Sequence, residues 1–150
     1  MPVSRISVDV PISTLLPGRV LRITSLAVLP MYDVVRIEYE MAPPMDPIDW
    51  EADDAAYEAW ARRNDWLLSG RDDQGVDYDD WGGARGLAPD GDKTYGERDL
   101  HPAPLPDATW LEITFHAAGY ATDMDHPRYA LRFALPLSAD SLSHEVAPTV

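Results

Sequence analysis

Apolar and polar residues alternate one by one in several parts of this 150-residue chain, and this pattern constrains the fold more than any other feature. Successive side chains of a β-strand point to opposite faces, so strict alternation is typical of strands that bury one face. The clearest runs are Ile6 to Ile12, Val35 to Met41, Leu111 to Phe115 and Tyr129 to Leu137. The pattern therefore predicts a mainly β protein whose strands share one apolar core.

Two pairs of segments lie close enough in the sequence to form antiparallel hairpins. Residues 20–29 and 34–41 are separated by a short turn that contains proline. Residues 110–117 and 128–137 are separated by a longer connection that contains glycine. Runs of this length with turn residues between them are typical of hairpins.

Three local features refine these strands. The parity of the apolar residues changes inside residues 20–29, which predicts a β-bulge between Thr24 and Ser25. Pro11 cannot donate a backbone hydrogen bond, so we expect the first strand to lie at an edge of a sheet or to end there. The tail from Ser138 has no periodic pattern, and we expect no strand in it.

The middle of the chain differs in composition from both ends. Residues 49–68 are rich in Ala and Glu and lack Gly and Pro, which predicts a helix over about residues 48–64 with Asp46 as its N-cap. Trp66 to Ser69 is expected to form a short strand. Gly70 to Gly96 is rich in Gly, Asp and Pro, so we expect a long acidic loop there.

The order of these elements indicates one class of fold. Predicted strands without a regular strand–helix alternation favour an antiparallel β-sandwich. A chain of this length fits one domain. We therefore expect a single domain over residues 1–150, with the helix and the acidic loop inserted at about residues 46–100.

Three segments resemble a group of uncharacterised actinobacterial proteins. They are residues 20–41, the D-D-Q-G-V-D-Y element at 72–78, and residues 103–115. In that group a D-D-x-G-x-x-Y element precedes a Gly-rich loop, and a Pro-Ala-Pro approach leads into a strand of alternating Leu and Thr. The group is similar to immunoglobulin-like β-sandwich domains, so the resemblance implies that fold and no known activity.

Charge and composition disfavour several classes of function. The formal net charge is −14, which disfavours binding to nucleic acids and to anionic membranes. The chain has no cysteine, which excludes a disulfide framework and thiolate chemistry. The first ten residues contain Arg5 and Asp9 and no apolar run of the signal-peptide kind, so we expect a cytoplasmic location.

The sequence contains no recognisable catalytic motif. There is no G-x-S-x-G element, no Walker loop and no dinucleotide fingerprint, so we expect no cofactor. One weak candidate for a metal site is formed by two imidazoles and two carboxylates around the predicted second hairpin: His116, Asp123, Asp125 and His126. Their spacing matches no known ligand pattern, and a solvated histidine on the polar face also explains His116.

Tryptophans and acidic residues are concentrated in the middle of the chain. The segment 49–99 holds 15 of the 26 acidic residues and six basic residues, a net charge of −9. Tryptophan anchors many protein interfaces, and acidic residues around it attract a basic partner. The tryptophans also suit the core side of a helix that covers the sandwich, so both roles stay open. The candidates for partner binding are Trp50, Trp60, Trp66, Asp77, Asp79, Asp80 and Trp81.

Three functions are consistent with these features. We expect a non-enzymatic module that binds a protein, such as an immunity-type inhibitor of a basic toxin. The second function is a metal-dependent enzyme that uses His116 and His126. The third is a structural or phage-derived component that associates with itself through exposed sheet edges.

Overall fold

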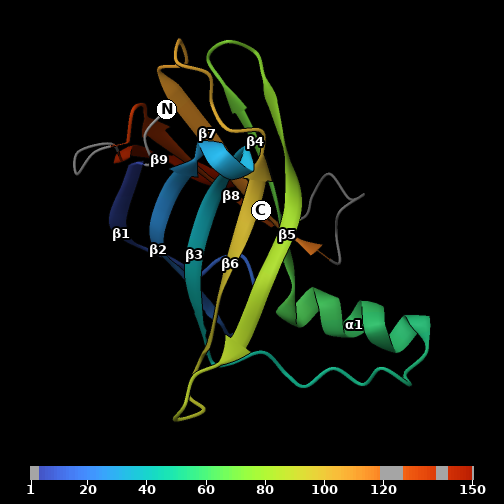
Figure 1. The fold of residues 1–150 in the computed structure, drawn as a ribbon. Helices are drawn as coiled ribbons and strands as arrows, with labels where there is room; N and C mark the ends of the chain where they lie inside the picture. The colour runs from blue at the N-terminus through green and yellow to red at the C-terminus, as the bar shows by residue number, and fades with distance from the viewer. Residues whose placement is uncertain (1–3, 119–126, 138–141, 150) are drawn as a thin grey trace.

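The computed structural model describes residues 4–118, 127–137 and 142–149, which form nine strands, one α-helix and one short 3-10 helix (Figure 1). The elements in chain order are β1 (Ser4–Ile12), β2 (Val20–Leu29), η1 (Pro30–Tyr32), β3 (Val34–Ala42), α1 (Asp54–Asn64), β4 (Trp66–Asp72), β5 (Asp77–Leu87), β6 (Thr94–His101), β7 (Trp110–Ala117), β8 (Arg128–Ala134) and β9 (Leu142–Thr149).

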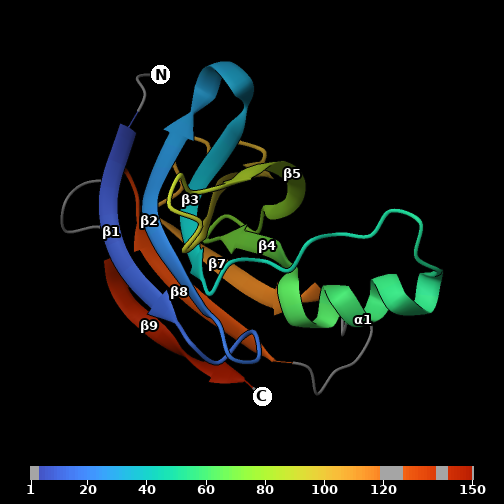
Figure 2. The ribbon, with the colours of Figure 1, turned by 90° about the horizontal axis from the view of Figure 1, so that it is seen from below.

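The strands form one antiparallel sheet in the order β1-β2-β3-β6-β5-β4-β7-β8-β9. The sheet is strongly curved and nearly closed, so its two edge strands, β1 and β9, lie on the same side of the molecule (Figures 1 and 2). A mainly β, antiparallel fold with one helix is therefore confirmed. The division into two packed sheets stays a prediction. Within the described ranges, no helix is both long and apolar enough to cross a lipid bilayer.

The two predicted hairpins are confirmed. β2 pairs with β3, and the register between them shifts between Ile23 and Ser25, as the change of parity predicts. β7 pairs with β8. β1 is an edge strand, in agreement with Pro11. Side chains from both halves of the sheet meet in one apolar core, which includes Ile37 and Phe133.

The predicted long acidic loop is wrong. Most of residues 70–96 belong to β4, β5 and β6, which occupy the centre of the sheet and connect its two halves. The alternation is hidden because Gly70, Asp72 and Asp80 occupy inward positions where the outer strands have aliphatic residues. Gly and Asp are typical of turns, but here the carboxylates have hydrogen-bond partners inside the fold.

Two boundaries also differ from the prediction. The helix begins at Asp54, because Asp53 is its N-cap and accepts a hydrogen bond from the Ala56 N–H at 2.8 Å. Asp46 lies in the irregular connection that precedes the helix. The tail forms β9, which pairs with β8, so the absence of a strand after Ser138 was also wrongly predicted.

Candidate functional site

The D-D-Q-G-V-D-Y element forms the turn between β4 and β5. The buried carboxylate of Asp72 accepts hydrogen bonds from the N–H groups of Gln74 and Val76, at 2.9 and 3.1 Å. Its second oxygen accepts a hydrogen bond from the Tyr78 hydroxyl at 2.7 Å. Burial, together with this bond, raises the pKa of Tyr78. The element therefore stabilises the hairpin that places β5.

Asp73 joins this turn to the start of β7. Its carboxylate accepts hydrogen bonds from the hydroxyl and the N–H of Thr109, both at 2.7 Å, and from the Trp110 N–H at 3.2 Å. These bonds, the Thr109 hydroxyl above all, lower the pKa of Asp73 to about 2. The first two aspartates of the element, Asp72 and Asp73, thus have structural roles.

β5 contains a β-bulge directly after this hairpin. The register with β6 shifts between Asp80 and Gly83, which leaves Trp81 and Gly82 at the bulge. Gly82 has φ +77°, in the left-handed region that favours glycine. A Cβ atom on Gly83 would overlap the backbone carbonyl of Glu97 in β6. The W-G-G sequence therefore specifies a bulge, and bulges redirect side chains.

The carboxylate of Asp80 holds this bulge from the inside. One oxygen accepts a hydrogen bond from the Gly82 N–H at 2.7 Å, and the other accepts bonds from the Leu68 N–H at 3.0 Å and from Arg98 at 3.1 Å. The Arg98 guanidinium lies 4.5 Å from the centre of the Trp66 ring, which is fully buried. Asp80 and Trp66 were predicted to bind a partner, but they belong to the interior.

Trp81, by contrast, is directed outward. Its side chain is 59% exposed, and its ring stacks on that of His101 with centroids 3.6 Å apart and an interplanar angle of 5°. The His101 Nε2 lies 3.1 Å from the Asp33 carboxylate, which also accepts a hydrogen bond from the Ala103 N–H at 3.0 Å. One face of the indole is therefore covered by a fixed imidazole, and the other faces solvent.

A hollow of about 620 Å³ lies on the outer face of β5, β4, β7 and β8. Small side chains form its floor, because the strand register aligns one residue from each strand: Asp79, Ser69, Thr114 and Ala130. The next residue in this row is His101 on β6, so the Trp81–His101 stack lies beside the hollow.

The walls of the hollow bring together residues that were predicted for different roles. Asp77 and Asp79, which are partner candidates, line its β5 side, and His116, a metal candidate, lines the β7 side. Arg128 is the cross-strand neighbour of His116 on β8. Arg71 and Glu112, which form an ion pair at 3.6 Å, also line the hollow, so its lining contains charges of both signs.

The contact between Ser69 and His116 is the one feature of the hollow that suggests catalysis. The Ser69 Oγ lies 2.9 Å from the His116 Nε2, as in a nucleophilic dyad. Acyl transfer also needs N–H donors directed at an oxyanion. β4 pairs with a strand on each side, and the Leu68 N–H donates to Asp80, so these N–H groups are already engaged. The backbone of β4 therefore does not supply these donors.

The structure does not test the four metal candidates as a group. Asp123, Asp125 and His126 lie outside the described residues. Within residues 4–118, 127–137 and 142–149, no three His, Asp or Glu side chains are grouped as ligands of one metal ion. Of the four candidates, only His116 can be placed.

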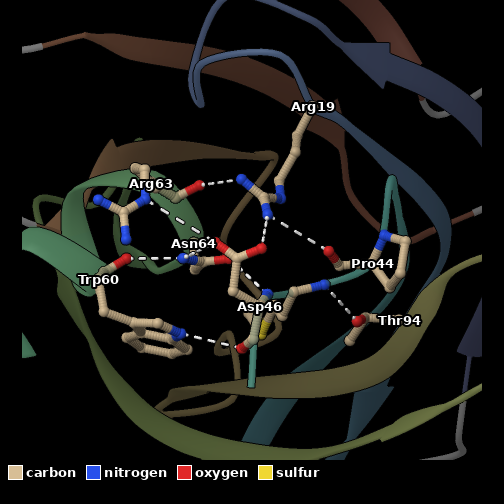
Figure 3. A network of polar contacts seen from close by, with 8 residues as sticks. Arg19, Pro44, Asp46, Trp60, Arg63, Asn64 and Thr94 are labelled. Carbon is tan, nitrogen blue, oxygen red and sulfur yellow. Dashed lines mark hydrogen bonds and ion pairs between the residues drawn. The ribbon is translucent and has the colours of Figure 1, made fainter. Parts of the chain in front are cut away.

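Residues 46–64, which we call the acidic arm, are fastened to the body by a polar network (Figure 3). Asn64 is fully buried and donates hydrogen bonds to the Asp46 carboxylate at 3.2 Å and to the Trp60 carbonyl at 2.9 Å. Arg19 donates to the same carboxylate at 2.9 Å. These contacts, Asn64 first and Arg19 next, lower the pKa of Asp46. The Trp60 indole donates to the Asp46 carbonyl at 2.9 Å, so this buried candidate belongs to the base of the arm.

Beyond its base the acidic arm extends away from the sheet, as both ribbon views show (Figures 1 and 2). Trp50 is 81% exposed, and Tyr57 is also exposed. No basic residue occurs between residues 49 and 61, whereas this stretch contains five acidic residues: Asp49, Glu51, Asp53, Asp54 and Glu58. The arm therefore presents aromatic side chains within a negative surface.

The structure separates the predicted partner site into two surfaces and adds residues to one of them. Trp50 lies on the acidic arm, whereas Asp77, Asp79 and Trp81 lie at the start of β5. His101, which stacks on Trp81, and Asp33, which binds His101, were not predicted. The W-G-G sequence was the available signal, because adjacent glycines inside a strand indicate a bulge.

Comparison with known proteins adds little. No protein-family model matches the chain, and no curated protein matches it significantly. Among solved structures, the chain is similar to the crystal structure of a conserved domain protein from Bacillus anthracis, with a TM-score of 0.48 and 17% sequence identity. The match covers 87% of this chain and 36% of the length of that protein. At this level the similarity carries no argument about function.

Proposed function

We propose that this chain is a non-enzymatic binding module whose partner is a protein with a basic surface. The observation that supports it most is the acidic arm, which combines the exposed Trp50 with five acidic residues and no basic residue between positions 49 and 61. Desolvation of an exposed indole stabilises a complex, and the surrounding charge accelerates association with a cationic partner.

A concrete form of this proposal is a cytoplasmic inhibitor of the immunity type that binds a basic, nuclease-like toxin. The small size and the net charge of −14 support this form, because such inhibitors recognise their targets by charge complementarity. The cytoplasmic location belongs to the same proposal and is tested by fractionation of the cells that express the protein.

The finer class of fold is also a proposal. An immunoglobulin-like sandwich, as in the actinobacterial group, is supported by the way in which the β1–β3 and β7–β8 segments contribute to one core cluster. An experimental structure in which these segments form two sheets that pack face to face would support the sandwich. A closed barrel, in which the edge strands β1 and β9 form hydrogen bonds with each other, would count against it.

The binding proposal is tested by capture of a partner on the immobilised chain from a lysate of the cells that encode it. We expect a discrete basic protein, identified by mass spectrometry, that binds at low ionic strength and is released by high salt. The double variant Trp50→Ala/Glu51→Gln is expected to reduce capture at least about tenfold, because an interface anchor contributes about 2 kcal/mol or more.

A matched control removes the same kinds of group elsewhere. Leu105→Ala/Asp107→Asn also removes one exposed apolar side chain and one carboxylate, but it lies in the connection before β7. This control is expected to capture the partner like the unaltered chain. Equal capture by both double variants, or the absence of any salt-sensitive basic protein, would refute the proposal.

A further inference from the structure

The most distinctive surface group outside the acidic arm is Trp81. The bulge that presents it needs glycine at two positions, and Asp80 holds the bulge in place. Its ring is fixed by His101, which in turn contacts Asp33 from the turn between β2 and β3. Three separate segments therefore keep an indole in a defined orientation at the surface, which lowers the entropic cost of binding to it.

Three tryptophans of the described chain have an arginine over the ring. The Arg98 guanidinium lies 4.5 Å from the Trp66 ring centre and bonds to Asp80 at 3.1 Å. The Arg132 guanidinium lies 4.1 Å from the Trp110 ring centre and bonds to Glu112 at 3.0 Å. The third guanidinium, from Arg85, lies 5.6 Å from the Trp60 ring centre. In the two closer contacts the arginine binds both an indole face and a carboxylate.

At Trp81 the arginine is missing, although the other two groups are present. Among the described residues, no guanidinium lies over this ring. Asp79 is the cross-strand neighbour of His101, which places its carboxylate beside the stack, since such pairs have Cβ atoms about 5 Å apart. Asp77 lies further along the same outer face, and neither carboxylate has an ion-pair partner in the described part of the chain.

We infer that Trp81 and Asp79 form a receptor for the guanidinium of an arginine side chain on the basic partner. The guanidinium stacks on the open face of the indole while its N–H groups bond to the Asp79 carboxylate. Arginine fits better than lysine, because its planar group can stack and bond to a carboxylate at the same time. The inference rests on the proposed function, since it names the chemistry of the partner.

The test uses NMR of the indole N–H signals in the ¹⁵N-labelled chain. The probe is a capped peptide of alternating Arg and Gly, and the comparison peptide has Lys in place of each Arg. The variant Trp81→Phe identifies the Trp81 signal by its loss. We expect the Arg peptide to shift this signal and to bind at least about twofold more tightly than the Lys peptide, because only the guanidinium can stack on the ring and bond to the carboxylate at the same time.

Two substitutions separate the contribution of the Trp81 ring to peptide binding from that of the Asp79 carboxylate. Trp81→Leu, in which binding is followed by the Asp79 backbone amide because the indole signal is lost, is expected to remove the preference for Arg over Lys. Asp79→Asn is expected to weaken binding of the Arg peptide about two- to fivefold. Asp107→Asn, which removes an exposed carboxylate elsewhere, is expected to change neither. The backbone amide spectrum of each variant shows that it is folded.

The inference is overturned if the Trp81 signal does not move, or if Arg and Lys peptides shift the Trp81 and Trp50 signals equally. This outcome differs from failure of the proposed function. If lysate capture yields no basic protein while the Arg peptide still binds at Trp81, the protein partner is refuted and the guanidinium receptor stands. If capture succeeds and Trp81→Leu leaves it unchanged, the receptor is refuted as part of that interface.

Discussion

The strands of the two outer segments, β1–β3 and β7–β8, bury different groups from the three strands between them. The outer strands fill their inward positions with aliphatic and aromatic residues such as Ile37 and Phe133. The central strands β4–β6 place Asp72, Asp80 and Arg98 there, and these groups are paired with one another or with backbone N–H groups. A strand can thus be held at the centre of a sheet by hydrogen bonds and charge pairs as well as by apolar burial.

The difference extends to the surface of the molecule. The outer strand β2 also contains a bulge, at Thr24, but the bulge at Gly82 lies in the polar centre of the sheet. Trp81 points outward in the alternation of β5 and lies at this bulge. The central strands, which bury more polar groups than the outer strands, thus also carry an exposed indole that is fixed by a stacking partner.

The largest loss of stability is expected from a substitution in the core of an outer strand. Phe133 is fully buried in β8, so Phe133→Ala should lower the free energy of unfolding by about 3–5 kcal/mol. Denaturant titration followed by circular dichroism measures this value. A loss below about 1 kcal/mol would show that the outer strands do not depend on apolar burial.

A slightly smaller loss of stability is expected when the buried polar groups of the central strands β5 and β6 are substituted. Asp80→Ala removes one of the two carboxylates that pair with Arg98, since Asp65 lies 3.3 Å from the same guanidinium. It also removes the acceptor of two N–H groups, so we expect a loss of about 2–3 kcal/mol. The double variant Asp80→Leu/Arg98→Met should lose more than Asp80→Ala, because it also leaves Asp65 without its cation. A double variant that is more stable than the single one would contradict this account of the central strands.

The bulge itself can be tested with two glycines of β5. Gly83→Ala should cost about 1–3 kcal/mol, because its Cβ atom would overlap the Glu97 carbonyl. Gly86→Ala is the matched control, since its Cβ atom would come no closer than 3.4 Å to the Tyr95 side chain. Thermal unfolding of both variants gives the comparison. Equal stability of the two would indicate that the bulge is not present.

The stability that the turn between β4 and β5 contributes should depend on pH. The pKa of Asp73 is lowered from 3.8 to about 2 in the folded chain, so its carboxylate stabilises the fold above pH 4 and loses this effect as the pH falls toward 2. Asp73→Asn should therefore lower Tm by a few degrees at neutral pH, and the difference should shrink as the pH falls. A Tm difference that is the same at pH 7 and near pH 2 would refute the role of the charge.

The smallest effect on stability is expected at the exposed tryptophan. Trp81→Leu should change the free energy of unfolding by no more than about 0.5 kcal/mol, because its side chain contributes little to the core. Chemical denaturation measures this, and Trp66→Leu, in the buried core, provides the contrast. A large loss in Trp81→Leu would mean that the ring has a structural role.

The sequence predicted the strands in which the alternation of apolar and polar residues matches the alternation of buried and exposed side chains. The outer hairpins and the bulge at Thr24 follow directly from alternation, because each inward position there is apolar. The central strands could not be found in this way, since residues such as Gly83 and Asp80 are as typical of a turn as of a bulged strand. Only the neighbouring strands of the sheet, which are distant in sequence, distinguish a turn from a bulged strand.

The candidate site was predicted in part for the same reason. Trp81 and Asp79 were correctly placed in an acidic and aromatic region, and both are exposed. Asp80 and Trp66 could not be assigned to the interior, because this required the parity of strands that were predicted as a loop. His101 was not predicted either, since it reaches Trp81 from a different strand.

The central claim is that β5 and β6 form the middle of the sheet and hold the Trp81 bulge. Amide hydrogen exchange measured by NMR tests it most directly. The account predicts that the ladder amides of residues 77–80 and 96–100 are protected about as strongly as those of β2 and β3. Exchange of these amides at the rate of an unstructured loop would contradict it.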